Sequence, residues 1–593
     1  MKYRAEIDGL RAIAVVPVIL FHVGFEIFSG GYVGVDIFFV ISGYLITMIL
    51  IEDIENKRFD LVYFYERRAR RILPALFFVM LICIPFAWLW MLPDPLENFG
   101  QSLLSTSLFS NNFLLMITST DYWALTGEYK PMLHTWSLAV EEQYYLLFPV
   151  FLIFTWRFGR SRVFWMIIIM ALISFSYSEW GWRNHPLLNF YFTFSRIWEL
   201  LAGSIAAFIV FKYGVIKNNY LSILGLIAIL FSIFLYDETV PFPSFFTLLP
   251  VLGSVMLVLY AEKDTFTAKI LSNKGLVAVG LISYSLYLWH QPILAFTRIY
   301  QKEPLSDLGA LFIVFLTTLF AFFTWKFIET PFRNRTKVSS KIILRLSIFM
   351  MIGFIAMGLY LDKTNGAPQR LFIDEEYQRS THEIKVASVS RVSLEDVELN
   401  NLNNNRIFIL GDSFAGDIAY LFEYKYPRLI DYELINSGSP SDTVCQTDLW
   451  TKAAALNISL VLFAYDEGFN ISCIEDVIET ANKKNIEVLF VGGKQFGYNL
   501  NWIARLESDD RKSLCQAPIP EAIKIDLRDI KNIPKKNYFS FFDSFLDNNC
   551  FPITNSSGEL LSSDRRHFTV SGVEFFADKF FENQTISQIL DTR

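Results

Sequence analysis

A serine, an aspartate and a histidine that lie far apart along the chain are the residue types of nucleophilic acyl transfer. Ser413 lies in the motif GDSFAGD directly after an apolar run, and Asp564 and His567 stand three residues apart in SDRRHF. In a helical turn that spacing places both side chains on one face, where a carboxylate can orient an imidazole. A plainer interpretation also fits, in which Ser413 caps a helix and the Asp–His pair is solvated at a helix start.

A second pair of residues lies in an apolar segment near the N-terminus. Arg11 and His22 are eleven positions apart, which in a helix is about three turns plus 20° and a rise of about 16 Å. Both side chains therefore share one helix face. Ionisable residues inside a membrane are costly unless they are paired or lie in a wet cavity, so they often mark functional sites. A structural hydrogen bond between helices fits His22 equally well.

A cluster of arginines stands where a predicted membrane span begins, in the stretch YERRARRILP. Its members are Arg67, Arg68, Arg70 and Arg71. Such a cluster is typical of a topology signal or a lipid contact. It also suits a clamp for a phosphorylated cofactor, because the guanidinium fork pairs with phosphate through two hydrogen bonds.

Two carboxylates at the outer ends of predicted spans are candidates for supporting roles. Asp36 lies in the glycine-rich stretch GGYVGVDIFFVISG, and Glu142 lies in HTWSLAVEEQYY. The glycines around Asp36 allow close packing of helices, which is a sufficient reason for their presence.

The elements that must position these residues begin with a series of membrane spans. Runs of roughly 17–21 apolar residues are long enough to cross a bilayer core of about 30 Å. The segment 98–117 carries too many Ser, Asn and Gln residues for a helix that faces lipid. The predicted fold is a multi-span α-helical membrane domain of ten helices plus one linking helix. The predicted spans are 10–28, 34–51, 72–92, 137–155, 163–178, 196–212, 220–236, 245–260, 276–296, 308–328 and 342–361.

The charge distribution predicts the orientation of the chain. Basic residues in short loops favour the cytoplasm, and these loops share one side if the N-terminus is cytoplasmic and 98–117 does not span. Residues 1–361 contain 28 Lys and Arg and 24 Asp and Glu, a net charge of +4, and the rest contains 24 and 35, a net charge of −11. The first apolar segment lacks a small-residue cleavage site, so we expect it to be retained as a span. The C-terminal part is therefore predicted to lie outside the cytoplasmic membrane.

The C-terminal part has the pattern of a soluble α/β domain. Short apolar runs at 406–410, 432–436, 459–465 and 488–493 alternate with amphipathic stretches after a polar linker. This alternation predicts a parallel sheet with right-handed crossovers, and Ser413 would lie at its carboxyl edge. The predicted domains are residues 1–335 in the membrane, 336–403 as an eleventh span with a linker, and 404–593 outside.

Composition excludes several classes of protein. The chain has 593 residues, of which 53% are hydrophobic and 19% are charged, with a formal net charge of −7. These values exclude a disordered chain and give no basic footprint for nucleic acid.

Outside the cytoplasm the C-terminal cysteines are expected to form one or two disulfides, and sequence leaves three full pairings open. They are Cys445, Cys473, Cys515 and Cys550. None has metal-ligand spacing with a histidine, so no metal is predicted.

The membrane part resembles the membrane-bound acyltransferase family 3 over about residues 5–335. The motifs that carry the resemblance are, in order, DGLRAIAV, GGYVGVDIFFVISG, RRARRILP, TWSLAVEEQYY and SYSLYLWHQP. The resemblance implies an enzyme that takes an acyl group, usually acetyl from acetyl-CoA, on the cytoplasmic side and hands it outward. It also implies that Arg11 and His22 are an essential pair, that Arg68 and Arg71 contact acyl-CoA, and that Glu142 supports the site.

The C-terminal part resembles the SGNH hydrolase family, a flavodoxin-like three-layer α/β fold. The resemblance rests on the Gly-Asp-Ser block and on the Asp–x–x–His block near the C-terminus. It implies that Ser413 is the nucleophile, His567 the general base and Asp564 its orienter. Gly438, in INSGSP, is the implied oxyanion donor together with the Ser413 amide. The third-block Asn of the family is absent, and the comparable stretch AYDEG carries Asp466.

Together the two parts predict an O-acetyltransferase that works as a relay. Acetyl from cytoplasmic acetyl-CoA would cross the membrane part, reach Ser413 and pass to a hydroxyl of a cell-envelope glycan, with a lipopolysaccharide O-antigen sugar as the first choice of acceptor. Peptidoglycan or another exopolysaccharide is an alternative acceptor. Two other functions also remain open: an outer domain that acts as a separate acetylesterase, and a transporter.

Overall fold

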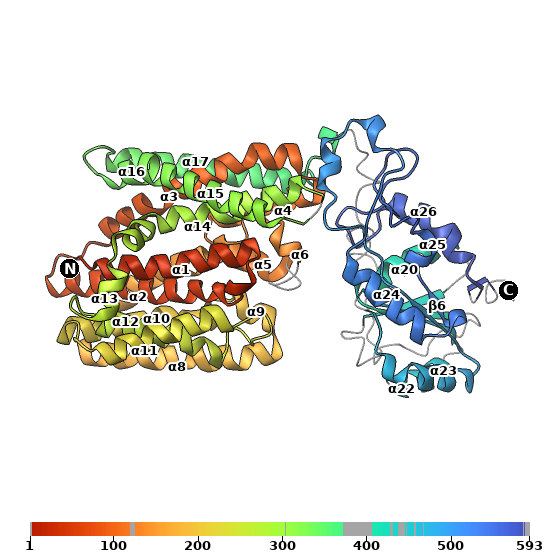
Figure 1. Cartoon of the computed structure of the whole chain (residues 1–593), viewed down its shortest axis with the longest axis horizontal. Helices are drawn as coiled ribbons and strands as arrows, with labels where there is room; N and C mark the ends of the chain where they lie inside the picture. Colours follow the sequence, from red (N-terminus) through yellow and green to blue (C-terminus); the bar gives the residue numbers. More distant parts are fainter. Residues whose placement is uncertain are drawn as a thin grey trace. The chain divides into compact units, whose positions relative to one another are not determined.

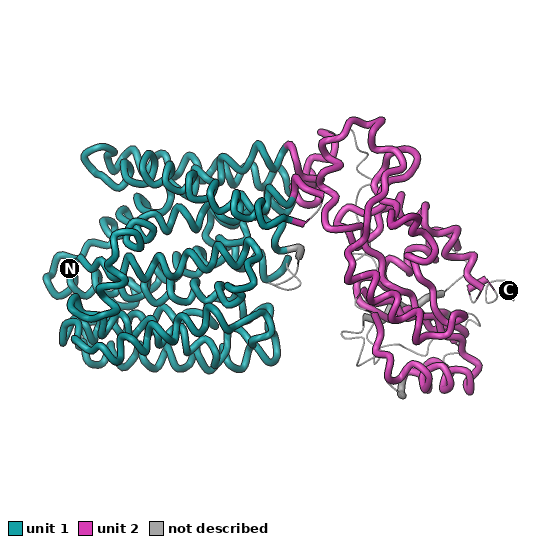
Figure 2. Tube along the Cα trace, in the orientation of Figure 1, with its two compact units in different colours: residues 1–88, 97–298, 305–363 teal, residues 89–96, 299–304, 364–593 magenta. Residues whose placement is uncertain are grey.

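Figure 1 shows the computed structural model of the chain. The structure describes residues 3–118, 125–302, 304–371, 406–426, 431–436, 445, 447–455, 458–466, 468–584 and 586–587. The chain divides into two compact units (Figure 2), and the second includes two short segments that precede residue 305. Unit 1 comprises residues 1–88, 97–298 and 305–363, and unit 2 comprises residues 89–96, 299–304 and 364–593. Much of the predicted linker, from residue 372 to residue 405, lies outside the described residues.

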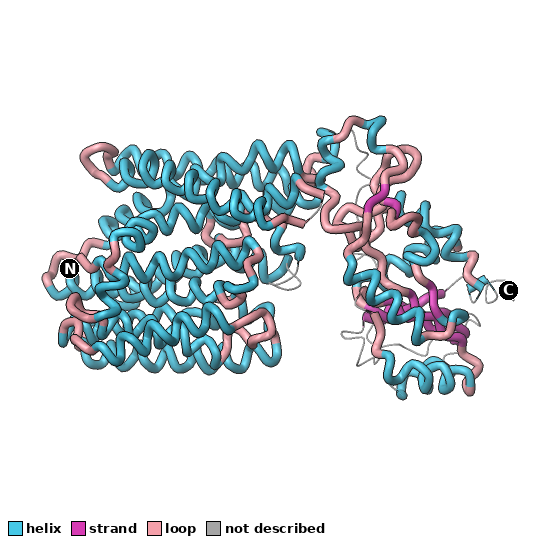
Figure 3. Tube along the Cα trace, in the orientation of Figure 1, coloured by secondary structure: helices cyan, strands magenta, loops and turns pink. Residues whose placement is uncertain are grey.

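Every secondary-structure element among the described residues of unit 1 is a helix, and loops join the helices (Figure 3). Three of the helices cross into unit 2: α3 and α14 end in it with two residues each, and α4 begins in it with four. The helices are α1 (Ala5–Val23), α2 (Gly34–Glu55), α3 (Leu61–Trp90), α4 (Pro93–Ser107), α5 (Asn111–Thr118), α6 (Leu125–Glu128), α7 (Thr135–Trp156), α8 (Arg160–Asn184), α9 (Pro186–Tyr191), α10 (Thr193–Tyr213), α11 (Asn219–Leu235), α12 (Leu248–Tyr260), α13 (Phe266–Leu271), α14 (Lys274–Tyr300), α15 (Asp307–Thr324), α16 (Thr330–Arg333) and α17 (Ser340–Lys363).

Among the described residues, seven helical segments are long and apolar enough to cross a membrane. Each predicted span contains a helix, and the count of eleven spans stays a prediction because α11 and α12 are shorter and α1 and α14 are not among the seven. The segment 98–117 is divided between α4 and α5. The seven are Gly31–Glu55, Leu61–Trp90, Thr135–Trp156, Arg160–Asn184, Pro186–Tyr213, Asp307–Arg333 and Ser340–Lys363.

Large apolar side chains cover the outside of this unit, as expected for a surface that faces lipid. Phe312 and Phe315 of α15 are 59% and 61% exposed, and Phe349 of α17 is 72% exposed. A patch of this kind is unfavourable in water and favourable in a bilayer. The chain is therefore a multi-pass membrane protein.

Helices α2 and α10 pack closely against each other inside unit 1. A Cβ at Gly43 of α2 would lie 1.9 Å from the carbonyl oxygen of Leu200 in α10, so only glycine fits there. Small residues at such a crossing let two backbones approach, as is typical of membrane helices.

Unit 2 contains a five-stranded sheet in the order β2-β1-β3-β4-β6, in which every neighbouring pair is parallel. This confirms the predicted parallel sheet. The order reverses direction between β1 and β3, which is where open α/β sheets usually bind ligands. The strands are β1 (Arg406–Gly411), β2 (Asp431–Asn436), β3 (Ile458–Ala464), β4 (Glu487–Val491) and β6 (Tyr538–Phe539).

Helices cover both faces of the sheet. Ile407 and Ile409 pack in one core with α20 (Ser413–Lys425) and α26 (Val570–Phe581). The alternate residues Phe408 and Leu410 pack in the other core with α22 (Thr447–Ala455) and α23 (Ile474–Asn482). Successive side chains of a strand point to opposite faces, so a continuous apolar strand is buried on both sides.

The remainder of unit 2 is irregular and is joined by disulfides. It contains α24 (Pro520–Asn532), α25 (Phe541–Phe545) and an antiparallel pair of β5 (Cys515–Gln516) with β7 (Phe551–Pro552). Of the three pairings left open by the sequence, the structure has Cys445–Cys473 and Cys515–Cys550.

The two short segments of unit 2 that precede residue 305 are held by side chains of residues 499–505. The Asn501 side chain accepts the Leu92 N–H at 2.8 Å. Asn499 donates hydrogen bonds to the carbonyl oxygens of Ile299 at 2.7 Å and Gln301 at 2.9 Å. Arg505 donates to the carbonyl oxygen of Tyr300 at 2.8 Å, and its guanidinium lies 3.7 Å from the centre of the Tyr300 ring. Unit 2 therefore includes more than the C-terminal part of the chain, because the ends of α3 and α14 and the beginning of α4 belong to it.

Candidate active site

Ser413 is the first residue of α20, directly beyond the carboxyl end of β1. The preceding residue Asp412 caps the helix, because its carboxylate accepts the Phe414 N–H at 2.8 Å. The Ser413 hydroxyl is therefore not the capping group. A Cβ at Gly411 would lie 1.9 Å from the carbonyl oxygen of Ala464, so this turn needs glycine to bring β1 and β3 together.

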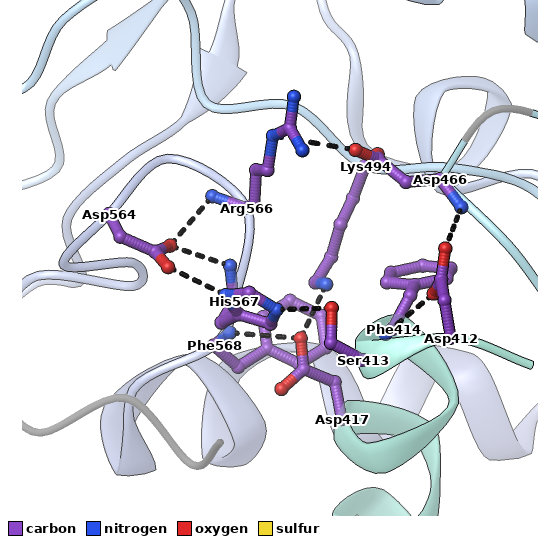
Figure 4. Close-up of polar contacts among 10 residues, drawn as sticks. All are labelled: Asp412, Ser413, Phe414, Asp417, Asp466, Lys494, Asp564, Arg566, His567 and Phe568. Carbon is purple, nitrogen blue, oxygen red and sulfur yellow. Dashed lines mark hydrogen bonds and ion pairs between the residues drawn. The ribbon is translucent and has the colours of Figure 1, made fainter. Parts of the chain in front are cut away.

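The structure brings Ser413, His567 and Asp564 into one hydrogen-bonded chain (Figure 4). The Nε2 atom of His567 lies 2.8 Å from the Ser413 Oγ, and its Nδ1 lies 2.6 Å from a carboxylate oxygen of Asp564. The carboxylate only accepts, so in the neutral ring Nδ1 carries the proton and Nε2 presents its lone pair to the serine hydroxyl. This is the arrangement in which a histidine can take the proton of an attacking serine.

Asp564 and His567 lie in an irregular loop before α26, and the predicted helical turn at this point is wrong. The intervening Arg565 has a φ of 79°, in the left-handed region that a helix excludes. Asp564 accepts the backbone N–H groups of Arg566 at 2.9 Å and His567 at 2.8 Å, which closes the turn locally. The two side chains meet through this turn rather than through a shared helix face.

The electrostatics of the pair favour a charged histidine. Burial by itself lowers the pKa of His567, but the Asp564 carboxylate and its hydrogen bond outweigh burial and raise it to about 9. Burial raises the pKa of Asp564, and the His567 ring together with two backbone amides brings it below its usual range. Asp564 is therefore ionised at neutral pH and can stabilise the imidazolium that forms during acyl transfer.

Two positions bear on the oxyanion donors that the resemblance implies, Gly438 and the place of the third-block Asn. Gly438, the predicted second donor, lies outside the described residues. Asp466 follows β3, and its backbone N–H donates to Asp412 at 3.3 Å. The Asp466 carboxylate lies 3.5 Å from the Nε of Arg566. Burial raises the pKa of Asp466, which Arg566 and Lys494 partly offset. An ionised carboxylate accepts hydrogen bonds only, so Asp466 does not replace the amide donor of an asparagine.

Sequence reasoning missed a buried ion pair beside these residues. Lys494 follows β4, and its ammonium lies 2.6 Å from the Asp417 carboxylate of α20, with both side chains at zero exposure. In Figure 4 the Lys494 side chain ends beside the rings of Phe414 and Phe568, the residues that directly follow Ser413 and His567. No motif around VGGK could have revealed it, because the contact joins segments 77 residues apart.

In unit 1 the structure gathers three predicted residues around one cavity. Arg11, Arg68 and Arg71 all line it, together with Glu141 and Tyr284. The arginines come from the beginnings of α1 and α3, so their proximity is a result of helix packing. Three guanidinium groups around one cavity suit an anionic ligand such as a phosphorylated cofactor. The predicted Glu142 is not among the lining residues of this cavity, whereas its neighbour Glu141 accepts a hydrogen bond from Ser42 at 2.9 Å.

His22 lies among other imidazoles of unit 1. Its ring centre is 5.2 Å from that of His290, which is 5.4 Å from that of His134. The Nδ1 of His22 lies 2.8 Å from the carbonyl oxygen of Val18. A carbonyl only accepts, so this bond places the proton of the neutral ring on Nδ1 and the lone pair on Nε2. That tautomer is suited to a base or an acyl acceptor.

Asp36 makes a structural contact between α2 and α10. Its carboxylate accepts a hydrogen bond from Arg196 at 2.8 Å, and the Nε of Arg196 lies 3.2 Å from Glu199. All three side chains are fully buried. Asp36 is absent from the lining of the cavity that holds Arg11. Among the described residues, no group of three His, Cys, Asp or Glu side chains is arranged to hold a metal ion.

Comparison with known proteins gives one matching family and several relatives. The family described as "Acyltransferase domain" matches residues 4–326. The chain is 31% identical over 474 residues to "Putative O-acetyltransferase SAR0937" of Staphylococcus aureus (strain MRSA252), a match that covers 72% of this chain and 76% of that protein. It is 32% identical over 357 residues to "O-acetyltransferase OatA" of Staphylococcus aureus (strain NCTC 8325 / PS 47), which covers 56% of this chain and 58% of that protein.

Proposed function

The chain belongs to the family of this acyltransferase domain, and from that premise we propose that it moves an acetyl group from cytoplasmic acetyl-CoA to a hydroxyl of a cell-envelope glycan. Membership confirms the predicted resemblance of the membrane part, and the chain is an acyltransferase. The observation that carries the proposal is the hydrogen-bonded chain of Ser413, His567 and Asp564 in a unit joined to an acyltransferase domain.

Arg11, Arg68 and Arg71 are proposed to hold the donor. Acetyl-CoA carries phosphates, and guanidinium groups bind phosphate through charge-assisted hydrogen bonds. The cavity that these three residues line supports this role. His22, on the same helix as Arg11, is proposed to act further along the path as a base or as an acyl acceptor.

Ser413 is proposed to receive the acetyl group and pass it on. Its Oγ attacks the acyl carbon of the donor while its proton moves to Nε2 of His567, and the departing group takes that proton as the old acyl bond breaks. A sugar hydroxyl then attacks the acetyl-serine and gives its proton to His567. The ester bond to Ser413 breaks, and His567 returns a proton to the serine oxygen. The net reaction moves one acetyl group and consumes no other reactant.

The proposed location is the cytoplasmic membrane of a bacterium, with the N-terminus in the cytoplasm and unit 2 outside. The basic loops of the membrane part support this orientation. Two disulfides in unit 2 are typical of an oxidising compartment, and so they support it as well.

The acceptor is proposed to be a lipopolysaccharide O-antigen sugar. Two relatives carry the name O-acetyltransferase, which supports an oxygen atom as the acceptor. The match that covers 72% of the chain extends beyond residues 4–326, so part of the similarity lies after the matched domain. Acetyl esters in the O-antigen and in peptidoglycan of the host, measured with and without the protein, identify the acceptor. Esters that depend on the protein only in peptidoglycan would overturn the O-antigen assignment.

The test of the relay is replacement of its proposed nucleophile and base. Ser413→Ala and His567→Ala should each reduce acetylation of the glycan to background while the protein remains in the membrane. Ser557→Ala, at an exposed serine of the same unit, is the matched control. Wild-type acetylation in Ser413→Ala would refute the relay.

The same residues suit an acetylesterase, which is the second candidate function. A Ser–His–Asp site hydrolyses an acyl-serine whenever water reaches it faster than a sugar. The full chain in detergent, given an acetyl ester without a glycan, separates the two functions. Turnover that a glycan acceptor does not accelerate supports the esterase, and turnover that depends on the acceptor supports the transferase.

A further inference from the structure

Lys494 is an unusual residue for the core in which it lies. Its side chain has no exposure, and the neighbouring core residues are apolar, among them Phe414 and Phe568. A buried charge is costly, and even a buried ion pair is often no more stable than apolar residues of similar size. The stability of the core therefore does not explain why a lysine and an aspartate occupy this position.

The contacts of Lys494 connect the two halves of the candidate active site. Its ammonium lies 3.8 Å from the centre of the Phe414 ring and 4.3 Å from that of Phe568. Phe414 directly follows Ser413, and Phe568 directly follows His567. The partner Asp417 lies one helical turn after Ser413, and its carboxylate also accepts the N–H of Phe568 at 3.2 Å. One ion pair thus touches the helix that carries Ser413 and the loop that carries His567 (Figure 4).

We propose that Lys494 is a positioning residue that, through Asp417, Phe414 and Phe568, holds Ser413 and His567 at hydrogen-bonding distance and keeps His567 able to accept a proton. This inference rests on the proposed role of the Ser413–His567–Asp564 chain. Lys494 itself touches neither the acyl group nor the reacting atoms in this arrangement, and it acts through the residues that do.

The charges around the two groups give the direction of the electrostatic effect. His567 faces Asp564 of its own loop and Asp417 of α20, which both raise its pKa, and Lys494, which lowers it. It also faces Asp466, which follows β3 and whose pKa the His567 ring lowers. Lys494 in turn faces Asp417, Asp466 and Asp564; burial lowers its pKa, and these carboxylates oppose the decrease. Without the lysine, Asp417 would act on His567 uncompensated. Without Asp417, the lysine would act alone in the opposite direction.

The test is the reaction of Ser413 with a fluorophosphonate probe, followed by mass spectrometry in the full chain in detergent between pH 6 and pH 10. Lys494→Met should react more slowly and move the pH midpoint upward. A rise of one pKa unit corresponds to about a tenfold slower reaction at pH 8. Asp417→Asn should move the midpoint downward. Lys483→Met is the matched control, because this lysine of the same unit is exposed and pairs with Glu479.

Opposite shifts in the two variants support the proposal, because general loss of structure cannot produce them. Wild-type rates and midpoints in both variants would overturn it. A slower reaction with an unchanged midpoint in both would overturn it too, because that result is typical of a purely structural pair. If Lys494→Met does not fold, Asp417→Asn decides alone through the direction of its shift.

Ser413→Ala in the same assay separates this inference from the proposed function. Labelling of Ser413→Ala at the wild-type rate would overturn both the nucleophile and the role of Lys494. If Ser413→Ala is unlabelled but still acetylates the glycan, the relay fails, while the shifts measured for Lys494→Met and Asp417→Asn still decide how the reactivity of Ser413 is set.

Discussion

His567 is the residue whose protonation state decides when the candidate site is reactive. It must be neutral to take the Ser413 proton, yet the Asp564 carboxylate stabilises its charged form. A strong interaction with Asp564 therefore has two opposite effects on His567. The neutral ring takes the Ser413 proton more readily, but a smaller fraction of the protein holds the ring in its neutral form before the reaction. The position of the midpoint on the pH scale is the measurable result of this compromise.

We expect the reaction of Ser413 with a fluorophosphonate to rise with pH and to have a midpoint near pH 9. The reason is that Asp564 outweighs burial and raises the pKa of His567 to about 9, so the free enzyme holds a protonated ring below that pH. Labelling rates of the full chain across the pH range measure the midpoint. Asp564→Asn should lower the midpoint and reduce the plateau rate by about 10³–10⁴-fold, because the ring loses the partner that sets its tautomer. A wild-type midpoint below pH 7 would contradict this account.

At the scale of elements, the pair α2 and α10 is held by two features, and both involve residues of the glycine-rich stretch for which the sequence predicts close packing of helices. One is the close backbone approach at Gly43, and the other is the buried cluster of Asp36, Arg196 and Glu199. Aromatic rings surround the Arg196 guanidinium, with Phe242 at 5.2 Å and Trp136 at 5.5 Å. A cation over aromatic faces and against two carboxylates is well compensated, so the cost of removing it is high.

Gly43→Ala should destabilise the membrane unit by about 1–3 kcal/mol, the usual range for overpacking. The added methyl group would lie 1.9 Å from the backbone of Leu200, so the two helices must separate. Thermal unfolding of the full chain in detergent measures the effect. Gly353→Ala on α17 is the control, because nothing lies within 4 Å of the Cβ it would add. Equal midpoints for the two variants would contradict the close approach.

Arg196→Met should destabilise the protein by about 3–5 kcal/mol, because it leaves two carboxylates buried without their cation. The same unfolding measurement applies, with Arg183→Met as the control, since Arg183 forms an exposed pair with Glu179 on α8. A smaller loss for Arg196→Met than for Arg183→Met would show that this cluster is not what holds α2 to α10.

At the scale of the whole molecule, the sequence predicts the individual helices, strands and motif residues better than the contacts between segments that are distant in the chain. The apolar spans and the strands around RIFIL follow from local hydrophobic periodicity, and Ser413, Asp564 and His567 follow from motifs. No pattern in the sequence indicates that Lys494 is buried, because a lysine after two glycines predicts an ordinary turn. Its position beside Phe414 and Phe568 follows only from the fold. The contacts of Asn499 with residues 299 and 301 are likewise a property of chain topology, and they explain why unit 2 begins before residue 404.

The proposed relay has two consecutive steps, binding of acetyl-CoA in the membrane part and transfer through Ser413. Two consecutive steps predict how a variant with both substitutions compares with the two single variants. Arg68→Met should raise the KM for acetyl-CoA by about 10–100-fold, because a hydrogen bond to a charged group contributes about 1.5–3 kcal/mol. Ser413→Ala should abolish acetylation of the glycan at any acetyl-CoA concentration. The double variant should then equal Ser413→Ala, because blocking the second step hides the first. Transfer of labelled acetyl to the glycan in membrane vesicles measures all three.

Arg67→Met is the control for Arg68, since Arg67 pairs with Asp53 at 3.1 Å and is not among the residues that line the cavity. If Arg68→Met retains the wild-type KM while Arg67→Met does not, the cavity is not the donor site, and the basic cluster serves topology or lipid contact instead.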